Sequence, residues 1–202
     1  GSKRTEILET LFGIRMKGKG QILVKGKEVQ NRSPKEAMAN GFAMLTEERR
    51  ATGIIPMLSV LDNTLAVSFK AMSGNRFGIL NPKKLLKDVE KINGELNVKT
   101  PSMKTEIQNL SGGNQQKVVL SKWLATKPDI LILDEPTRGI DVGAKYEIYE
   151  LIINMAKQGK TIIVVSSEMP EILGITNRIG VMSNGRLAGI VNTKETDQEE
   201  LL

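Results

Sequence analysis

Residues 109–145, NLSGGNQQKVVLSKWLATKPDILILDEPTRGIDVGAK, decide the fold of this chain. The stretch opens with LSGG at residues 110–113, where a hydroxyl residue and two glycines lead into a predicted helix. Glycines let backbone N–H groups come close to a ligand, and the start of a helix adds partial positive charge. The segment therefore predicts an anion-binding loop, although Ser-Gly-Gly before a helix is also an ordinary helix cap. The helix itself is predicted from apolar residues at helical spacing, namely Val119, Leu120, Trp123 and Leu124.

The second half of this stretch is a predicted strand that ends in two carboxylates. Residues 130–133 (ILIL) are consecutively apolar, which favours a strand buried on both faces, as in a parallel sheet. Asp134 and Glu135 follow directly, and ligands of parallel sheets gather at the carboxyl ends of the strands. The pair indicates a site for a metal–nucleotide complex, although Asp-Glu after a strand is also a common acidic start of the next helix.

The composition narrows the class of protein. A chain of 202 residues can bury a full core, and it contains no run of 18 apolar residues that would predict a membrane span. The absence of cysteine fits a reducing compartment. The net charge of +6 comes from scattered basic residues, and one Trp, two Tyr and four Phe are too few for a base-stacking surface. We therefore expect no nucleic-acid partner.

Predicted strands and helices alternate along the rest of the chain, which indicates an α/β fold with a mostly parallel sheet. Strands are expected over 20–24, 42–45 and 161–165, helices over 6–12, 34–40, 60–71, 82–96 and 145–158, and a hairpin over 178–191. On helix 145–158 we expect one apolar stripe of Tyr146, Tyr149, Ile153 and Ala156, flanked by Ile148, Ile152 and Met155.

These motifs together resemble the ABC-type ATPase family, and the resemblance covers essentially the whole chain. LSGGNQQK is similar to the family's signature motif, ILILDE to its Walker B motif, and the segment through Asp141 to its D-loop. The resemblance implies a P-loop NTPase fold, in which an α/β core carries an inserted helical subdomain. It assigns residues 1–50 and 118–202 to the core and residues 51–117 to the helical subdomain.

The resemblance also implies ATP and Mg²⁺ as cofactors and gives roles to the residues of these motifs. Asp134 would bind magnesium and Glu135 would polarise the attacking water. Nucleotide contacts would come from the signature and the D-loop, through Ser111, Gly112, Gly113, Gln115 and Asp141.

The phosphate loop of the family is degenerate in this chain. Lys3 stands where the loop has glycine and Arg4 where it has lysine, whereas Thr5 conforms as a magnesium ligand. We assign all three residues to nucleotide binding. The preceding strand and the aromatic that stacks on adenine would lie upstream of residue 1, so we expect the N-terminal part of the domain to be truncated.

Two further positions depart from the family pattern at its catalytic residues. Glu47 occupies the place of a glutamine that senses magnesium and water, as in sugar importers with Glu-x-Arg, although residues 47–50 also fit a solvated charged loop. Ser167 occupies the place of a histidine that contacts the terminal phosphate. The resemblance therefore implies a weak site in this half, whose intact signature completes the ATP site of a partner half.

The segments TRGIDVGAK and VVSSEMPEILGITNRIGVMSNG resemble the second ATP-binding half of tandem bacterial monosaccharide importers, most closely of the galactose/methyl-galactoside type. This implies an ATPase whose isolated half is inactive and which lies peripherally on the cytoplasmic side of the inner membrane. Its partners would be the first half of the same protein, a transmembrane permease and, indirectly, a periplasmic sugar-binding protein.

Some alternatives stay open at this point. A soluble ABC ATPase acting on nucleic acid or ribosomes, and a non-catalytic structural half, are the rival functions. Four apolar residues after the Glu47 loop either dock the permease or form the subdomain's own core: Met57, Leu58, Val60 and Leu61.

Overall fold

A three-stranded parallel sheet forms the centre of the computed structural model, which describes residues 3–68 and 81–201. The strand order is β3-β4-β5, and Met44, Ile132 and Ile163 lie in register across it. Strand β4 is central, and residues 131–134 within it are buried, as the apolar run predicts. The bounds are β3 Phe42–Leu45, β4 Ile130–Asp134 and β5 Thr161–Val165.

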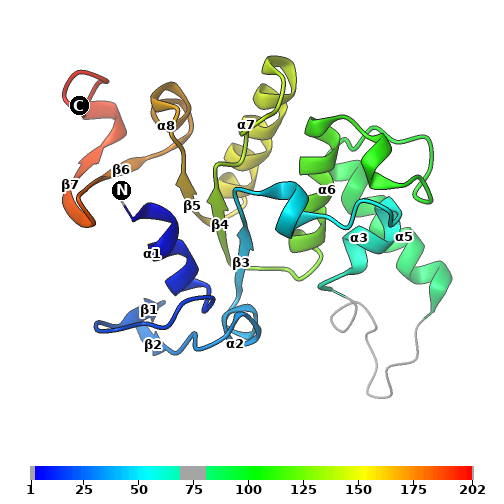
Figure 1. Cartoon of the computed structure of the whole chain (residues 1–202), viewed down its shortest axis with the longest axis horizontal. Coiled ribbons are helices and arrows are strands. Elements are labelled where there is room, and N and C mark those ends of the chain that lie inside the picture. The colour runs from blue at the N-terminus through cyan, green and yellow to red at the C-terminus, as the bar shows by residue number, and fades with distance from the viewer. Residues whose placement is uncertain (1–2, 69–80, 202) are drawn as a thin grey trace.

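Helices cover both faces of this sheet (Figure 1). Ile132 faces a cluster formed with α1 (Arg4–Leu11) and α2 (Pro34–Ala39), whereas its neighbours Leu131 and Leu133 face a larger cluster with α6 and α7. This alternation follows from the two-residue repeat of a strand. Both faces of the sheet are therefore buried under helices. The predicted α/β fold class is confirmed.

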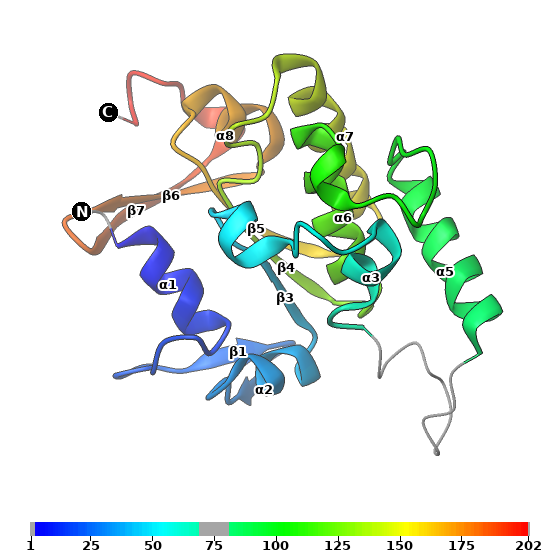
Figure 2. The same ribbon diagram turned by 45° about the vertical axis from the view of Figure 1, so that its right-hand side comes forward.

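Helix α6 (Gly112–Leu124), which follows the LSGG segment, belongs to two layers at once. It packs on the sheet through Val118 and Leu120 and also touches α3 (Val60–Leu65) and α5 (Pro82–Glu95), as Figure 2 shows. The predicted helix 82–96 is confirmed. The predicted helix 60–71 ends earlier, at Leu65, and its last three positions lie outside the described residues.

Helix α7 (Val142–Lys157) begins three residues before its predicted start because the Asp141 side chain caps it. The expected stripe on this helix was wrong. Ile148, Ile152 and Met155, expected only to flank the stripe, are the buried residues, whereas Tyr146 is 66% exposed. The helix turns that flank toward α6 and β5, so Tyr146 remains on its outer side.

Two antiparallel pairs and several short elements complete the chain. The Asn184-Gly185 turn has the two positive φ angles that such a two-residue hairpin turn requires, which confirms the predicted hairpin. Among the described residues no helix is both long and apolar enough to cross a bilayer. The remaining elements are β1 Ile22–Val24, β2 Lys27–Val29, η1 Arg49–Gly53, η2 Ile107–Asn109, α8 Met169–Ile175, β6 Arg178–Ser183, β7 Arg186–Asn192 and η3 Thr193–Glu195.

Candidate functional site

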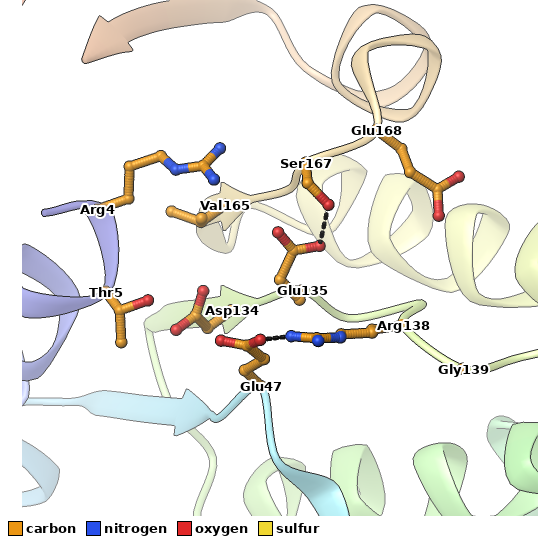
Figure 3. A pocket seen from close by; sticks show the side chains of 10 residues that line it. All are labelled: Arg4, Thr5, Glu47, Asp134, Glu135, Arg138, Gly139, Val165, Ser167 and Glu168. Carbon is orange, nitrogen blue, oxygen red and sulfur yellow. Dashed lines mark hydrogen bonds and ion pairs between the residues drawn. The ribbon is translucent and has the colours of Figure 1, made fainter. Parts of the chain in front are cut away.

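A polar pocket of about 380 Å³ lies where the carboxyl ends of β3, β4 and β5 meet the start of α1 (Figure 3). Parallel strands bring their carboxyl ends to one edge, so residues far apart in sequence converge there. Six of the predicted site residues line this pocket. Its lining is Arg4, Thr5, Glu47, Asp134, Glu135, Arg138, Gly139, Val165, Ser167 and Glu168.

Asp134 is the buried carboxylate of this pocket. It is 1% exposed, and its Oδ1 has no hydrogen-bond partner among the described residues. Burial raises the pKa of Asp134, a hydrogen bond with Thr5 opposes that rise, and the charge of Glu135 adds to it. A buried oxygen with unfilled acceptor capacity beside a hydroxyl group fits a hard cation such as Mg²⁺.

A magnesium ion at this place would have few protein ligands. Within residues 3–68 and 81–201, no group of three or more His, Cys, Asp or Glu side chains is arranged to hold a metal. Asp134 and Thr5 would therefore share the ion with phosphate oxygens and water, which is how Mg²⁺ is usually bound beside nucleotides. The residues present fit the ion only together with a nucleotide.

Glu135 is held by the neighbouring strand and by Ser167. Its N–H donates to the Val165 carbonyl at 2.8 Å, and the Ser167 hydroxyl donates to Glu135 Oε2 at 3.2 Å. Glu135 has a left-handed backbone with φ of 49°, which is uncommon for a residue with a side chain and typical of functional sites. The carboxylate points into the pocket beside Ser167 (Figure 3).

Glu47 forms an ion pair with Arg138, and both side chains line the pocket (Figure 3). The two residues follow neighbouring parallel strands, which explains why they meet. Glu47 therefore belongs to the site, whereas Glu48 and Arg50 beside it are exposed, as a solvated loop predicts. Sequence reasoning missed Arg138, although it is the basic residue of the DEPTRGID segment.

Of the three N-terminal residues assigned to nucleotide binding, Arg4 and Thr5 line the pocket and Lys3 does not. Arg4 Nη1 donates to the carbonyl of Ser166 at 3.0 Å, so the guanidinium is tied to the loop after β5. Lys3 does not line the pocket, and its side chain lies instead against Gly185 of the β6–β7 turn. Lys3 has φ of 59°, the left-handed region that favours the glycine of a phosphate loop.

The signature residues lie outside this pocket, at the first turn of α6. Ser111 caps the helix, because its Oγ accepts from the N–H of Asn114 at 3.4 Å. A Cβ on Gly112 would lie 3.3 Å from Arg49 Nη2 and 3.4 Å from the Gly139 carbonyl. The segment is thus both an ordinary cap and a crowded turn with backbone N–H groups at its start.

Two other signature residues have structural tasks. A Cβ on Gly113 would come within 2.5 Å of Ala144 Cβ in α7, so packing alone requires glycine there. Gln115 was expected to contact nucleotide, but its side chain is buried and donates to the carbonyls of Ile107 and Leu110. The Gln115 side chain thereby holds the loop that precedes the signature. Asp141 likewise serves as the N-cap of α7 and does not line the pocket.

Sequence reasoning also missed Glu171, which joins the loops that follow β4 and β5. Its buried carboxylate accepts from the Thr137 hydroxyl at 3.0 Å and from the Ser166 hydroxyl. Burial raises the pKa of Glu171, and the two hydrogen bonds oppose that rise. These bonds fix the loops that carry Glu135 and Ser167 relative to each other.

The close approach at Gly113 gives a packing prediction. Gly113→Ala should lower the free energy of unfolding by about 1–3 kcal/mol, because the new methyl group overlaps Ala144. The cost should fall by at least about half in an Ala144→Gly background. Gly94→Ala is the matched control, since a Cβ there meets nothing within 4 Å. Denaturant unfolding is measured for Gly113→Ala, Ala144→Gly, the double variant and Gly94→Ala. If Gly113→Ala costs the same free energy of unfolding with and without Ala144→Gly, the packing account is contradicted.

Comparison with known protein families supports the reading of these motifs. A family model described as ABC transporter matches residues 1–138. A galactose/methyl galactoside import ATP-binding protein, MglA, of Fusobacterium nucleatum is 57% identical over the whole chain, and the MglA of Vibrio vulnificus is 56% identical. The chain spans about 40% of the length of these curated relatives.

Solved structures show the same fold at low identity. A nucleotide-free ATP-binding cassette from an ABC transporter superposes with a TM-score of 0.80 at 18% identity, covering 95% of this chain and 76% of that one. The cbiO1 protein of Clostridium perfringens, part of the cbiONQ transporter complex, gives 0.78 at 24% identity and covers 99% and 76%. The α/β core and the added helices are therefore those of an ATP-binding cassette.

Proposed function

Because this chain belongs to the ABC transporter family, we propose that it is the second nucleotide-binding half of a tandem ATPase that drives galactose or methyl-galactoside import. The names of its relatives support the substrate class, and the share of their length that it spans leaves room for a first half. ATP would bind between the two halves. The observation that carries the proposal is the pairing of an intact signature turn with a pocket that lacks the usual lysine and histidine.

In this half's own pocket, the proposal assigns roles to six of the lining residues. Asp134 and Thr5 would hold Mg²⁺, which neutralises charge on the phosphates when it is bound. Glu135 can accept a proton from water, and the Ser167 hydroxyl keeps its carboxylate in the pocket. Glu47 is oriented by its ion pair with Arg138.

The same pocket has few groups that could stabilise the negative charge that develops on a phosphate during transfer. The Arg4 guanidinium is tied to the Ser166 carbonyl, and Lys3 lies away from the pocket. Ser167 is a short neutral group where a histidine would reach further. Phosphoryl transfer depends on positioning and on preorganised charge, so this pocket should turn over slowly.

The signature turn is the part that would serve the other half. The first N–H groups of α6 lack helical partners and carry the positive end of the helix dipole, so they suit the phosphates of a nucleotide held elsewhere. We keep the division into a core of residues 1–50 and 118–202 and a helical subdomain of residues 51–117 as part of this proposal.

The surface after η1 is the proposed contact with a transmembrane permease. Met57 is 68% exposed and Leu58 39%, with Ile55 beside them at 50%. Val60 is fully buried and Leu61 packs against a core cluster, so these two belong to the subdomain's interior. The protein would then lie peripherally on the cytoplasmic side of the inner membrane, with a periplasmic sugar-binding protein acting through the permease.

The asymmetry of the two sites gives the principal test. In the full-length protein, Gly112→Asp should lower ATP hydrolysis by orders of magnitude, because it places a carboxylate where a phosphate must approach the backbone. Arg49 beside Gly112 can pair with that carboxylate, so the fold should tolerate it. Glu135→Gln should cost less than about tenfold, or roughly 1.4 kcal/mol of barrier. The measurement is the steady-state ATPase rate of each full-length variant. Equal losses of ATPase rate in both variants would exclude the asymmetric proposal.

The docking surface gives a second prediction. Met57→Asp combined with Leu58→Asp should uncouple ATP hydrolysis from sugar uptake in reconstituted vesicles, because charges replace an apolar contact with the permease. Met16→Asp is the control, since Met16 is 93% exposed and lies in the loop between α1 and β1. Sugar uptake at the wild-type level in the double variant would rule this surface out.

A third prediction concerns nucleotide binding by the 202-residue chain alone. Isothermal titration with Mg-ATP should show a Kd in the millimolar range, about −4 kcal/mol, because Lys3 and Arg4 do not form a phosphate loop. Lys3→Gly combined with Arg4→Lys should bind more tightly, since glycine relieves the positive φ and lysine reaches phosphates. Micromolar binding by the unchanged chain would show that its pocket is competent.

A further inference from the structure

Helix α6 contains two buried lysines that are compensated in different ways. Lys117 donates to the Asn97 carbonyl and pairs with Glu147. Lys122 is 7% exposed and donates to the carbonyl of Gly53 in η1, with no carboxylate at ion-pair distance among the described residues. A buried ammonium without a counter-ion is costly. The position of Lys122 therefore calls for a reason other than stability.

The ammonium of Lys122 keeps its charge in this setting at neutral pH. Burial lowers its pKa to about 8, which is still above neutrality. Its Nζ lies 5.4 Å from the centre of the Trp123 ring, a cation–π distance that offsets part of the desolvation. Lys122 can thus make a strong, charge-assisted bond to Gly53.

The η1 segment is attached to α6 at a second place, near the signature. The Arg49 guanidinium lies over Gly112 in the first turn of α6, whereas Lys122 is in the last turn. Between these points a Cβ on Gly53 would lie 3.4 Å from Val119 Cγ2, which is a van der Waals contact distance. Segment η1 therefore lies directly against the signature helix.

The apolar segment 55–58 continues directly from η1 and is itself firmly held. The buried Asn63 side chain bonds both the N–H and the carbonyl of Ile55, at 2.8 and 3.1 Å. The Leu58 carbonyl accepts from the N–H of Ile107, whose own carbonyl is bonded by Gln115 of α6. The exposed segment and the signature helix are therefore joined on two sides.

We propose that Lys122 is a positioning residue that clamps η1 to α6, so that a displacement of segment 55–58 carries Gly112 and Gly113 with it. The clamp would link a partner bound at segment 55–58 to the signature turn, and in this respect it rests on the proposed function. Lys122 touches no nucleotide site itself. It acts by keeping the docking segment and the signature turn in one rigid unit.

The test uses the full-length protein assembled with its permease in vesicles. ATPase rates are measured with and without sugar-loaded binding protein for wild type, Lys122→Met, Lys122→Arg and Lys117→Met. The stimulation ratio is the ATPase rate with sugar-loaded binding protein divided by the rate without it. Lys122→Met should lower this ratio by at least about fivefold, and Lys122→Arg should keep much of the wild-type ratio. Lys117→Met, which removes the other buried lysine of α6, should keep the wild-type ratio. A Lys122→Met protein with an unchanged ratio would overturn the clamp.

Hydrogen exchange in the same proteins tests the clamp without reference to transport. The amide of Ile54, which donates to the Arg49 carbonyl and closes η1, should exchange at least about tenfold faster in Lys122→Met but not in Lys117→Met. Unchanged exchange at Ile54 would also overturn the clamp. If wild type shows no stimulation by the binding protein while Ile54 responds as expected, the importer function fails and the clamp stands.

Discussion

The burial of strand β4 on both faces is the constraint on which the rest of the structure depends. Ile132 packs into one cluster while Leu131 and Leu133 pack into the other, so helices must cover both sides of the sheet. The same burial removes water from Asp134 at the end of the strand, raises its pKa and leaves one oxygen without a partner. The carboxylate to which we assign Mg²⁺ is therefore a consequence of how the fold forms its core.

Helix α6 carries several buried polar side chains, and three of them bond to backbone carbonyls of loops that border the site or the signature. Gln115 holds the loop before the signature, Gln116 donates to the Pro136 carbonyl after β4, and Lys122 holds η1. A buried donor left without an acceptor costs about 1–3 kcal/mol, so these bonds constrain the loops strongly. Three loops are therefore positioned by one helix. A displacement of one of these loops can be transmitted to another through α6.

The strand-end pocket and the signature turn differ in how many of their expected groups are in place. The pocket at the strand ends has its carboxylates in place, but Arg4 is turned to the Ser166 carbonyl and no histidine is present in the chain. The signature turn has its cap, its free N–H groups and the glycines that its packing requires. In the proposed function such a chain would complete another nucleotide site, because the backbone donors of a helix start need no further residue from this chain.

The sequence by itself determined most strands and helices, though not α8, together with the buried strand 130–133, the signature helix and the Asp134–Glu135 pair, because each rests on local periodicity or adjacency. Only the tertiary structure decided which face of α7 is buried, and that Gln115 points inward. It alone revealed the Glu47–Arg138 pair, the Glu171 link and the bond from Lys122 to Gly53, whose partners stand 69 positions apart. Such contacts depend on which loops meet at a sheet edge and which side of a helix packs, and no short-range pattern contains that information.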